Sequence, residues 1–204
     1  MRRSKIAILI LVLFSIPMIQ NCGGSDNGGG RSDIIVADQL INDGWDAVAL
    51  GNYQTGASSF QQALGMPLSD AQRVNAYNGL GWAMSKDGKI LESIQYFEVA
   101  ADKENEAKVG LAGALIYRHQ TSVDYIRAAE LLGNMPPEKF SATHAGLGLS
   151  AAKVHALAAL AYALSGDQTM AQTYMNKAAA LDSMMVGTTV DRIDEAFLML
   201  GWKD

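Results

Sequence analysis

Apolar residues recur at helical spacing in the middle of the chain. One stripe has members that are three, one and three residues apart: Tyr77, Leu80, Gly81 and Met84. A second stripe recurs every three or four residues: Ile90, Ile94, Phe97 and Ala101. This spacing indicates two helices with one apolar face each, and the Asp87-Gly88 pair between them is typical of a turn. Because an amphipathic helix is not stable by itself, the pattern predicts a helical hairpin that packs against neighbours.

The same features occur earlier in the chain at a constant distance. An offset of 37 residues relates three pairs: Gly44 and Gly81, Gly51 and Gly88, and Phe60 and Phe97. Between these hairpins, Gly65 and Pro67 are expected to end one helix, and Ser69-x-x-Gln72 forms a capping box for the next. A fixed period of this size indicates helical pairs that stack as repeats.

Two more hairpins follow along the chain. Residues 109–115 match residues 78–84 at an offset of 31, and residues 125–132 supply the second helix of this third hairpin. A fourth hairpin spans residues 154–181, with a turn at Gly166-Asp167. The sequence therefore predicts about four helical pairs.

Two segments depart from the hairpin pattern. The linker at residues 134–149 contains Pro136-Pro137 and leaves room for an extra short helix. Residues 197–202 repeat the pattern of a first helix without a second one. A half repeat of this kind predicts a helix that caps the exposed end of the stack.

The N-terminus has the organisation of a secretion signal. Residues 1–21 begin with basic residues and continue into an apolar run that is too short to span a bilayer. The only cysteine, Cys22, follows directly, and the sequence before it resembles the bacterial lipobox. This resemblance implies that Cys22 becomes the lipidated first residue, and Gly23 after it points to the outer membrane. Residues 23–33 are rich in Gly, Ser and Asp, which predicts a flexible tether.

The composition favours helices and argues against nucleic-acid binding. Among 204 residues only 4 are proline, and alternating runs of Val, Ile and Thr that would suggest strands are absent. The net charge of −5 becomes −8 if the leader is removed with Arg2, Arg3 and Lys5. We do not expect such an acidic chain to bind nucleic acid.

Motifs that imitate catalytic sites are weak. Ser150-x-x-Lys153 matches a motif of penicillin-binding enzymes, but the companion K-T-G motif is absent. His119, His144 and His155 lack the spacing and the companion cysteines of a metal site, so we expect them in solvent or at the edge of the core. The sequence therefore predicts no catalytic residue, no metal site and no cofactor, and the protein is not expected to be an enzyme.

The repeated residues resemble the tetratricopeptide repeat family. The matching positions of the central hairpin are Tyr77, Leu80, Gly81, Gly88, Phe97 and Ala100. The resemblance covers residues 33–202. It implies that residues 34–204 form one all-α domain, a right-handed α-solenoid of about four hairpins with a C-terminal capping helix.

In this family the position after the first-helix glycine faces a concave groove. The resemblance therefore places Trp45 and Trp82 in the groove, with three polar companions: Asn78, Lys86 and Tyr117. Aromatic residues among polar groups are typical of protein-binding hot spots. The alternative is that both indoles pack between adjacent first helices as part of the core.

These patterns predict a membrane-anchored scaffold that binds a protein or peptide partner in its groove. The lipid on Cys22 would hold the scaffold in a bacterial cell envelope, at the periplasmic face of the outer membrane. Similar small lipoproteins assist outer-membrane protein assembly or pilus biogenesis, which is an argument by analogy only. The alternative is an enzyme or a small-ligand binder, which would need a cluster of ionisable groups in the same groove.

Overall fold

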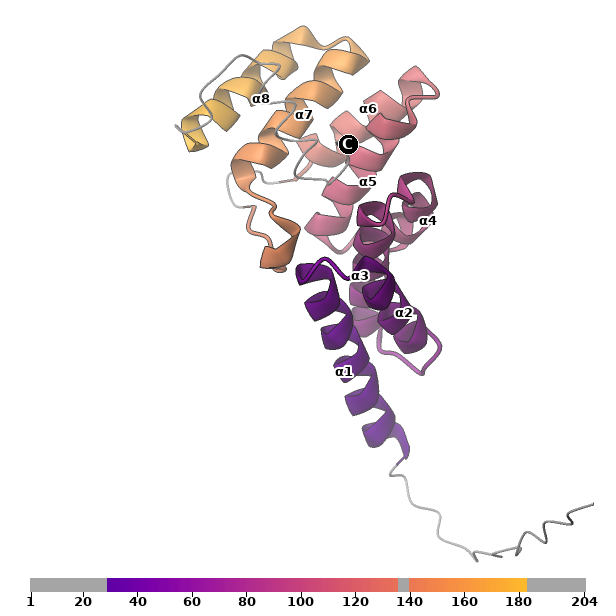
Figure 1. Cartoon of the computed structure of the whole chain (residues 1–204). Helices are drawn as coiled ribbons and strands as arrows, with labels where there is room; N and C mark the ends of the chain where they lie inside the picture. Colours follow the sequence, from indigo (N-terminus) through magenta and orange to yellow (C-terminus); the bar gives the residue numbers. More distant parts are fainter. Residues whose placement is uncertain (1–28, 136–139, 183–204) are drawn as a thin grey trace, which may run out of the picture.

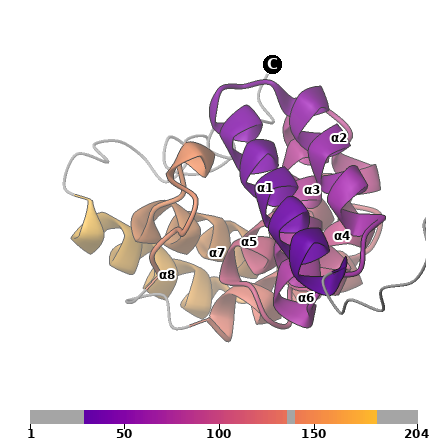
Figure 2. The ribbon, with the colours of Figure 1, turned by 90° about the horizontal axis from the view of Figure 1, so that it is seen from below.

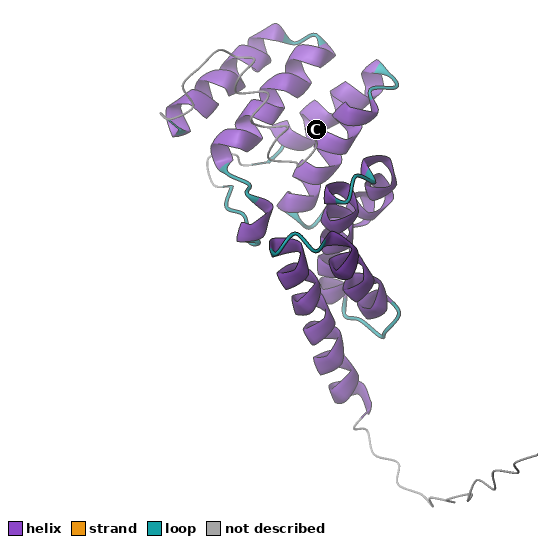
Figure 3. Cartoon of the chain, in the orientation of Figure 1, coloured by secondary structure: helices purple, strands orange, loops and turns teal. Residues whose placement is uncertain are grey.

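The computed structural model describes residues 29–135 and 140–182, and this part of the chain is all-α (Figure 3). It contains eight α-helices, one short 3-10 helix and no strand. The α-helices are α1 (Gly29–Ala49), α2 (Tyr53–Leu64), α3 (Asp70–Lys86), α4 (Ile90–Ala100), α5 (Asn105–Arg118), α6 (Ser122–Gly133), α7 (Ala151–Ser165) and α8 (Gln168–Leu181). The 3-10 helix is η2 (Ala145–Leu147).

The predicted turns and helix ends are confirmed. Gly51, Gly88 and Gly166 have φ values of 78°, 83° and 95°, a left-handed conformation that glycine adopts without steric penalty. The predicted capping box at the start of α3 is present, with the Ser69 hydroxyl accepting from the backbone N–H of Gln72. These signals are local, since each acts within a few residues of a hairpin boundary.

Helix α1 begins earlier than predicted. Residues 29–33 were expected in the flexible tether, but α1 starts at Gly29. The physical reason is that extending a helix is easier than nucleating one. The turns around Ala37 and Ile41 are fixed because both side chains are buried, and the helix continues from them toward the N-terminus.

Consecutive helices pack as hairpins, and the odd-numbered helices also contact one another. Helix α3 touches α1 and α5, and α5 touches α7. The hairpins follow one another from α1 and α2 to α7 and α8 (Figure 1). In Figure 2 the α7 and α8 pair lies to one side of α1 and α3, so the last hairpin is displaced sideways from the first two.

Two buried phenylalanines join successive hairpins in the same way. Phe60 of α2 lies against Gly44 and Gly79, and a Cβ built on Gly79 would be 2.2 Å from its ring. Phe97 of α4 lies against Gly81 and Gly110, and a Cβ on Gly110 would be 2.4 Å from its ring. Each ring therefore fills space that two glycines of neighbouring odd-numbered helices leave open. The two phenylalanines, 37 residues apart in the sequence, thus occupy equivalent positions in successive hairpins.

The C-terminal half of helix α3 is enclosed on all sides rather than on one face. Every residue from 78 to 85 is buried, because α3 contacts four helices: α1, α2, α4 and α5. The stripe of Tyr77, Leu80, Gly81 and Met84 is thus only part of its contact surface. Helices α2 and α4 keep a single buried face and match the predicted pattern.

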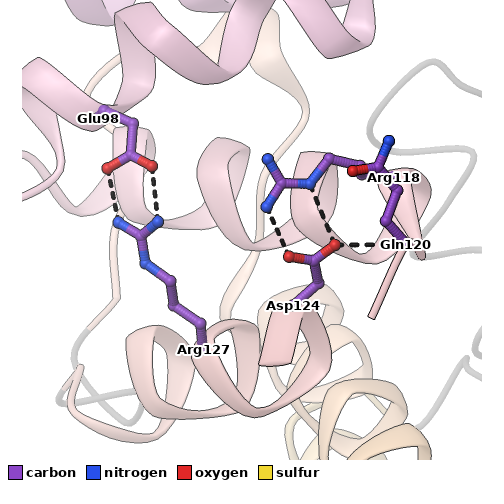
Figure 4. A network of polar contacts seen from close by, with 5 residues as sticks. All are labelled: Glu98, Arg118, Gln120, Asp124 and Arg127. Atoms are coloured by element: carbon purple, nitrogen blue, oxygen red, sulfur yellow. Dashed lines mark hydrogen bonds and ion pairs between the residues drawn. The ribbon is translucent and has the colours of Figure 1, made fainter. Parts of the chain in front are cut away.

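Ion pairs on α6 hold the third hairpin (Figure 4). The guanidinium of Arg127 donates to both oxygens of Glu98 on α4, at 2.7 and 2.6 Å. One turn earlier on α6, Asp124 accepts from Arg118 and from the backbone N–H of Gln120. The Arg118 hydrogen bonds hold the pKa of Asp124 below its usual value of 3.8. The hydrogen bonds of Asp124 fix the turn between α5 and α6, whereas the pair of Arg127 and Glu98 joins α6 to α4.

Several predictions concern residues outside the described ranges. These are the leader, Cys22 and the capping helix at residues 197–202. The extra short helix expected in the linker is confirmed as η2. Within residues 29–135 and 140–182, no helix combines the length and the apolar character needed to cross a bilayer.

Candidate functional site

Trp45 lies where the linker before η2 meets the row of odd-numbered helices. Its indole N–H donates to Oδ1 of Asn75 on α3, at 2.8 Å. The imidazole of His144 stacks on the indole, with ring centroids 3.5 Å apart and an interplanar angle of 11°. Phe60 meets the indole edge-on at 5.3 Å. The ring is therefore fixed by contacts from three other segments and is only 8% exposed.

A buried carboxylate holds His144 in this position. Glu106, in the first turn of α5, accepts from the backbone N–H of His144 at 2.8 Å and from its Nδ1 at 2.6 Å. Asn78 of α3 donates to the same carboxylate at 3.1 Å. The Glu106 side chain is 3% exposed, so these bonds replace the water that it loses on burial. The cluster joins α3, α5 and the linker.

Hydrogen bonds favour the charged form of Glu106 in spite of its burial. Burial alone would raise the pKa of Glu106, but the hydrogen bonds from the side chain and backbone of His144 outweigh it and lower the pKa. Burial and the nearby charge of Glu106 raise the pKa of Glu104, at the start of α5. A charged Glu106 is also favoured by the N-terminal end of a helix. The charged carboxylate of Glu106 therefore holds the cluster together by accepting hydrogen bonds from His144 and Asn78.

We expect acid to weaken the fold through Glu106. In the folded state the pKa of Glu106 lies below its usual value of 4.5. Its charged carboxylate therefore stabilises the fold fully above about pH 4.5, and this contribution disappears as the pH falls through the lowered pKa of the folded state. In Glu106→Gln this part of the pH dependence should vanish. Urea midpoints measured from pH 6 to about pH 3 would check it, with the exposed Glu92→Gln of α4 as the matched control. Parallel curves for wild type and Glu106→Gln would contradict this assignment.

A cavity of about 240 Å³ opens beside the stacked rings. It lies between the C-terminal half of α1 and the η2 segment, and we call it the Trp45 cavity. Its lining residues are Trp45, Asp46, Val48, Ala49, His144, Ala145, Gly146 and Leu147. Gly146 allows the close approach of the two walls, since a Cβ there would be 2.7 Å from that of Ala49. The cavity is mostly apolar, with one exposed carboxylate.

The structure separates the five residues predicted to share a groove. Trp82 and Asn78 are 0% and 1% exposed, so neither offers a free surface to a partner and the groove position predicted for them is wrong. The reason is the enclosure of α3 by four helices. The indole N–H of Trp82 and the Oδ1 of Asn78 find no hydrogen-bond partner among the described residues.

Lys86 and Tyr117 lie elsewhere. The Lys86 ammonium is 6.0 Å from the centre of the Trp82 ring, and burial and the charge of Lys153 lower its pKa. Tyr117 is 45% exposed and lines a separate cavity at the turn between α3 and α4. Of the predicted set, only Trp45 lines the Trp45 cavity.

Sequence reasoning missed the residues that complete this site. His144 was expected in solvent or at the edge of the core, and its side chain is 22% exposed, which agrees with an edge position. Its pairing with Glu106 and its stacking on Trp45 were not predicted. Glu106 carried no signal, because the predicted helix of the third hairpin began at residue 109, three residues after it. The 38 residues between Glu106 and His144 hide their contact from any local pattern. A loop histidine near a proline pair was the one available hint.

No group of three or more potential metal ligands occurs in the part of the chain that the structure describes. Comparison of the sequence with protein-family models and with characterised proteins finds no significant match. The argument for function therefore rests on the geometry of the Trp45 cavity and on the sequence pattern.

Proposed function

We propose that this protein is a lipid-anchored scaffold that binds a segment of another protein in the Trp45 cavity. The observation that carries the proposal is the cavity itself, an apolar recess of about 240 Å³ whose wall includes a fixed tryptophan. Rigid aromatic side chains at the edge of a recess are typical of protein-binding hot spots. Stacking against His144 and the hydrogen bond to Asn75 keep the indole in one orientation. Binding therefore costs little conformational entropy of this side chain.

We further propose that the helical pairs form a right-handed solenoid of the tetratricopeptide type. Three features support this finer description: the equivalent insertion of Phe60 and Phe97, the glycine turns, and the contacts among odd-numbered helices. In such an array each unit contacts mainly its neighbours, which leaves an extended surface for partners. The leader and Cys22 in the sequence support anchoring in a bacterial envelope, at the outer membrane.

The second candidate is a small-ligand binder or an enzyme, and one observation favours it. His144 forms a pair with Glu106 on the wall of a cavity, and a carboxylate that orients an imidazole is one component of many acid-base sites. The ring is stacked on Trp45, however, and no serine, threonine or cysteine is among the lining residues of this cavity. The arrangement therefore favours binding over catalysis.

A photo-crosslinking amino acid tests the scaffold proposal in intact envelopes. Placed at Ala145, an exposed residue of the Trp45 cavity, it should give one discrete adduct. The same group at Gln61, an exposed residue of α2 outside that cavity, is the matched control and should give none. Equal adducts at both positions would argue against the cavity as the binding site.

Labelling with a fatty-acid analogue tests the lipid anchor in the same cells. Cys22→Ser should abolish this labelling, and labelling that persists would argue against a lipid on Cys22.

A further inference from the structure

The charges around the Trp45 cavity distinguish the partners that it could accept. The ionisable residues that line it are Asp46 and His144. The charge of a protonated His144 is balanced by the buried carboxylate of Glu106. Asp46 is exposed, and in the described ranges it forms no ion pair. The cavity therefore presents a net negative charge beside apolar walls.

Resting on the proposed function, we infer that the cavity binds the side chain of a lysine or arginine from the partner segment. These side chains combine an apolar stem with a cationic head. The stem would lie between the two exposed alanines of the cavity walls, Ala49 and Ala145, beside the indole of Trp45, and the head would reach the carboxylate of Asp46.

Other side chains fit these surroundings less well. An acidic side chain would meet the like charge of Asp46. A neutral aliphatic side chain would remove water from Asp46 without replacing it, which is unfavourable for a charged group. The Trp45 ring offers the cation little surface, because the residue is only 8% exposed and His144 covers one of its faces. The net charge of −5 would also attract a basic partner at long range.

Four tripeptides of the form acetyl-Gly-X-Gly-amide test the inference, with X as lysine, arginine, norleucine or glutamate. They are titrated into the ¹⁵N-labelled full chain, and the indole N–H signal of Trp45 is followed by NMR. The signal should move saturably with the lysine and arginine peptides and weakly with norleucine. Glutamate should leave it unmoved. Tighter binding of norleucine than of lysine would overturn the inference.

A pair of aspartates on α1 supplies the matched control. Asp46→Asn should weaken binding of the lysine peptide by roughly fivefold, the upper range for an exposed ion pair. Asp43→Asn lies one turn earlier, where Asp43 accepts from Gln39 and does not line the cavity, and it should bind as wild type. Equal binding by both variants would overturn the cation inference. If the Ala145 adduct persists in Asp46→Asn while lysine selectivity is absent, the scaffold proposal stands and only this inference fails.

Discussion

Trp82→Ala is expected to lower the free energy of unfolding by about 3–5 kcal/mol, the range typical of a large aromatic removed from a core. The indole is 0% exposed and meets Phe97 edge-on, with centroids 5.4 Å apart. Its removal would leave a cavity in the buried part of α3, which α1, α2, α4 and α5 all touch. Relaxation of so many neighbours around the gap is restricted, which places the expected loss in this range.

Urea unfolding measures this effect, because the midpoint shifts with stability while the slope stays nearly constant. Tyr117→Ala is the matched aromatic control, since that ring is 45% exposed, and it should lose less than about 1 kcal/mol. A loss of similar size for both variants would contradict the buried position of Trp82. A change in slope would indicate that Trp82→Ala also altered the denatured or native ensemble.

Gly110→Ala is expected to destabilise the protein by about 1–3 kcal/mol, as overpacking of a filled site does. In an open helix position the same substitution would increase stability, because alanine is the better helix former by up to about 1 kcal/mol. Here the added methyl would lie 2.4 Å from the Phe97 ring. The sign of the change therefore reports whether the ring occupies the space that Gly81 and Gly110 leave open.

Two variants make this measurement decisive. Phe97→Leu combined with Gly110→Ala should lose less stability than the sum of the single changes, because the smaller side chain makes room for the methyl. Gly65→Ala is the milder comparison, since Gly65 has a right-handed φ of −78° and an added Cβ would be 3.3 Å from the backbone oxygen of Gln62, a tight contact but not an overlap. It should lose less stability than Gly110→Ala. Additive losses in the double variant would contradict direct contact between the ring and residue 110.

The helices and their turns follow from the sequence because their causes are local. A left-handed glycine, a capping box and an apolar stripe act over a few residues, so Gly88, Ser69 and the helix that contains Phe97 could be recognised one by one. The constant offset between hairpins added that the helical pairs repeat. Burial of α3 could not be predicted in this way, because a stripe indicates one contact surface and gives no count of neighbours.

The site was decided by tertiary structure. Trp45 and Trp82 occupy equivalent sequence positions and both are buried, but only Trp45 meets the linker, whose His144 stacks on it. Trp82 instead lies among the core residues of α3, where Phe97 meets it edge-on. The pair of Glu106 and His144 arises because α5 and the linker approach each other across 38 residues of sequence. The sequence alone determined which segments are helices. The packing of those helices and the path of the irregular linker determined which tryptophan lines a cavity, because burial and charge pairing depend on neighbours that no local pattern specifies.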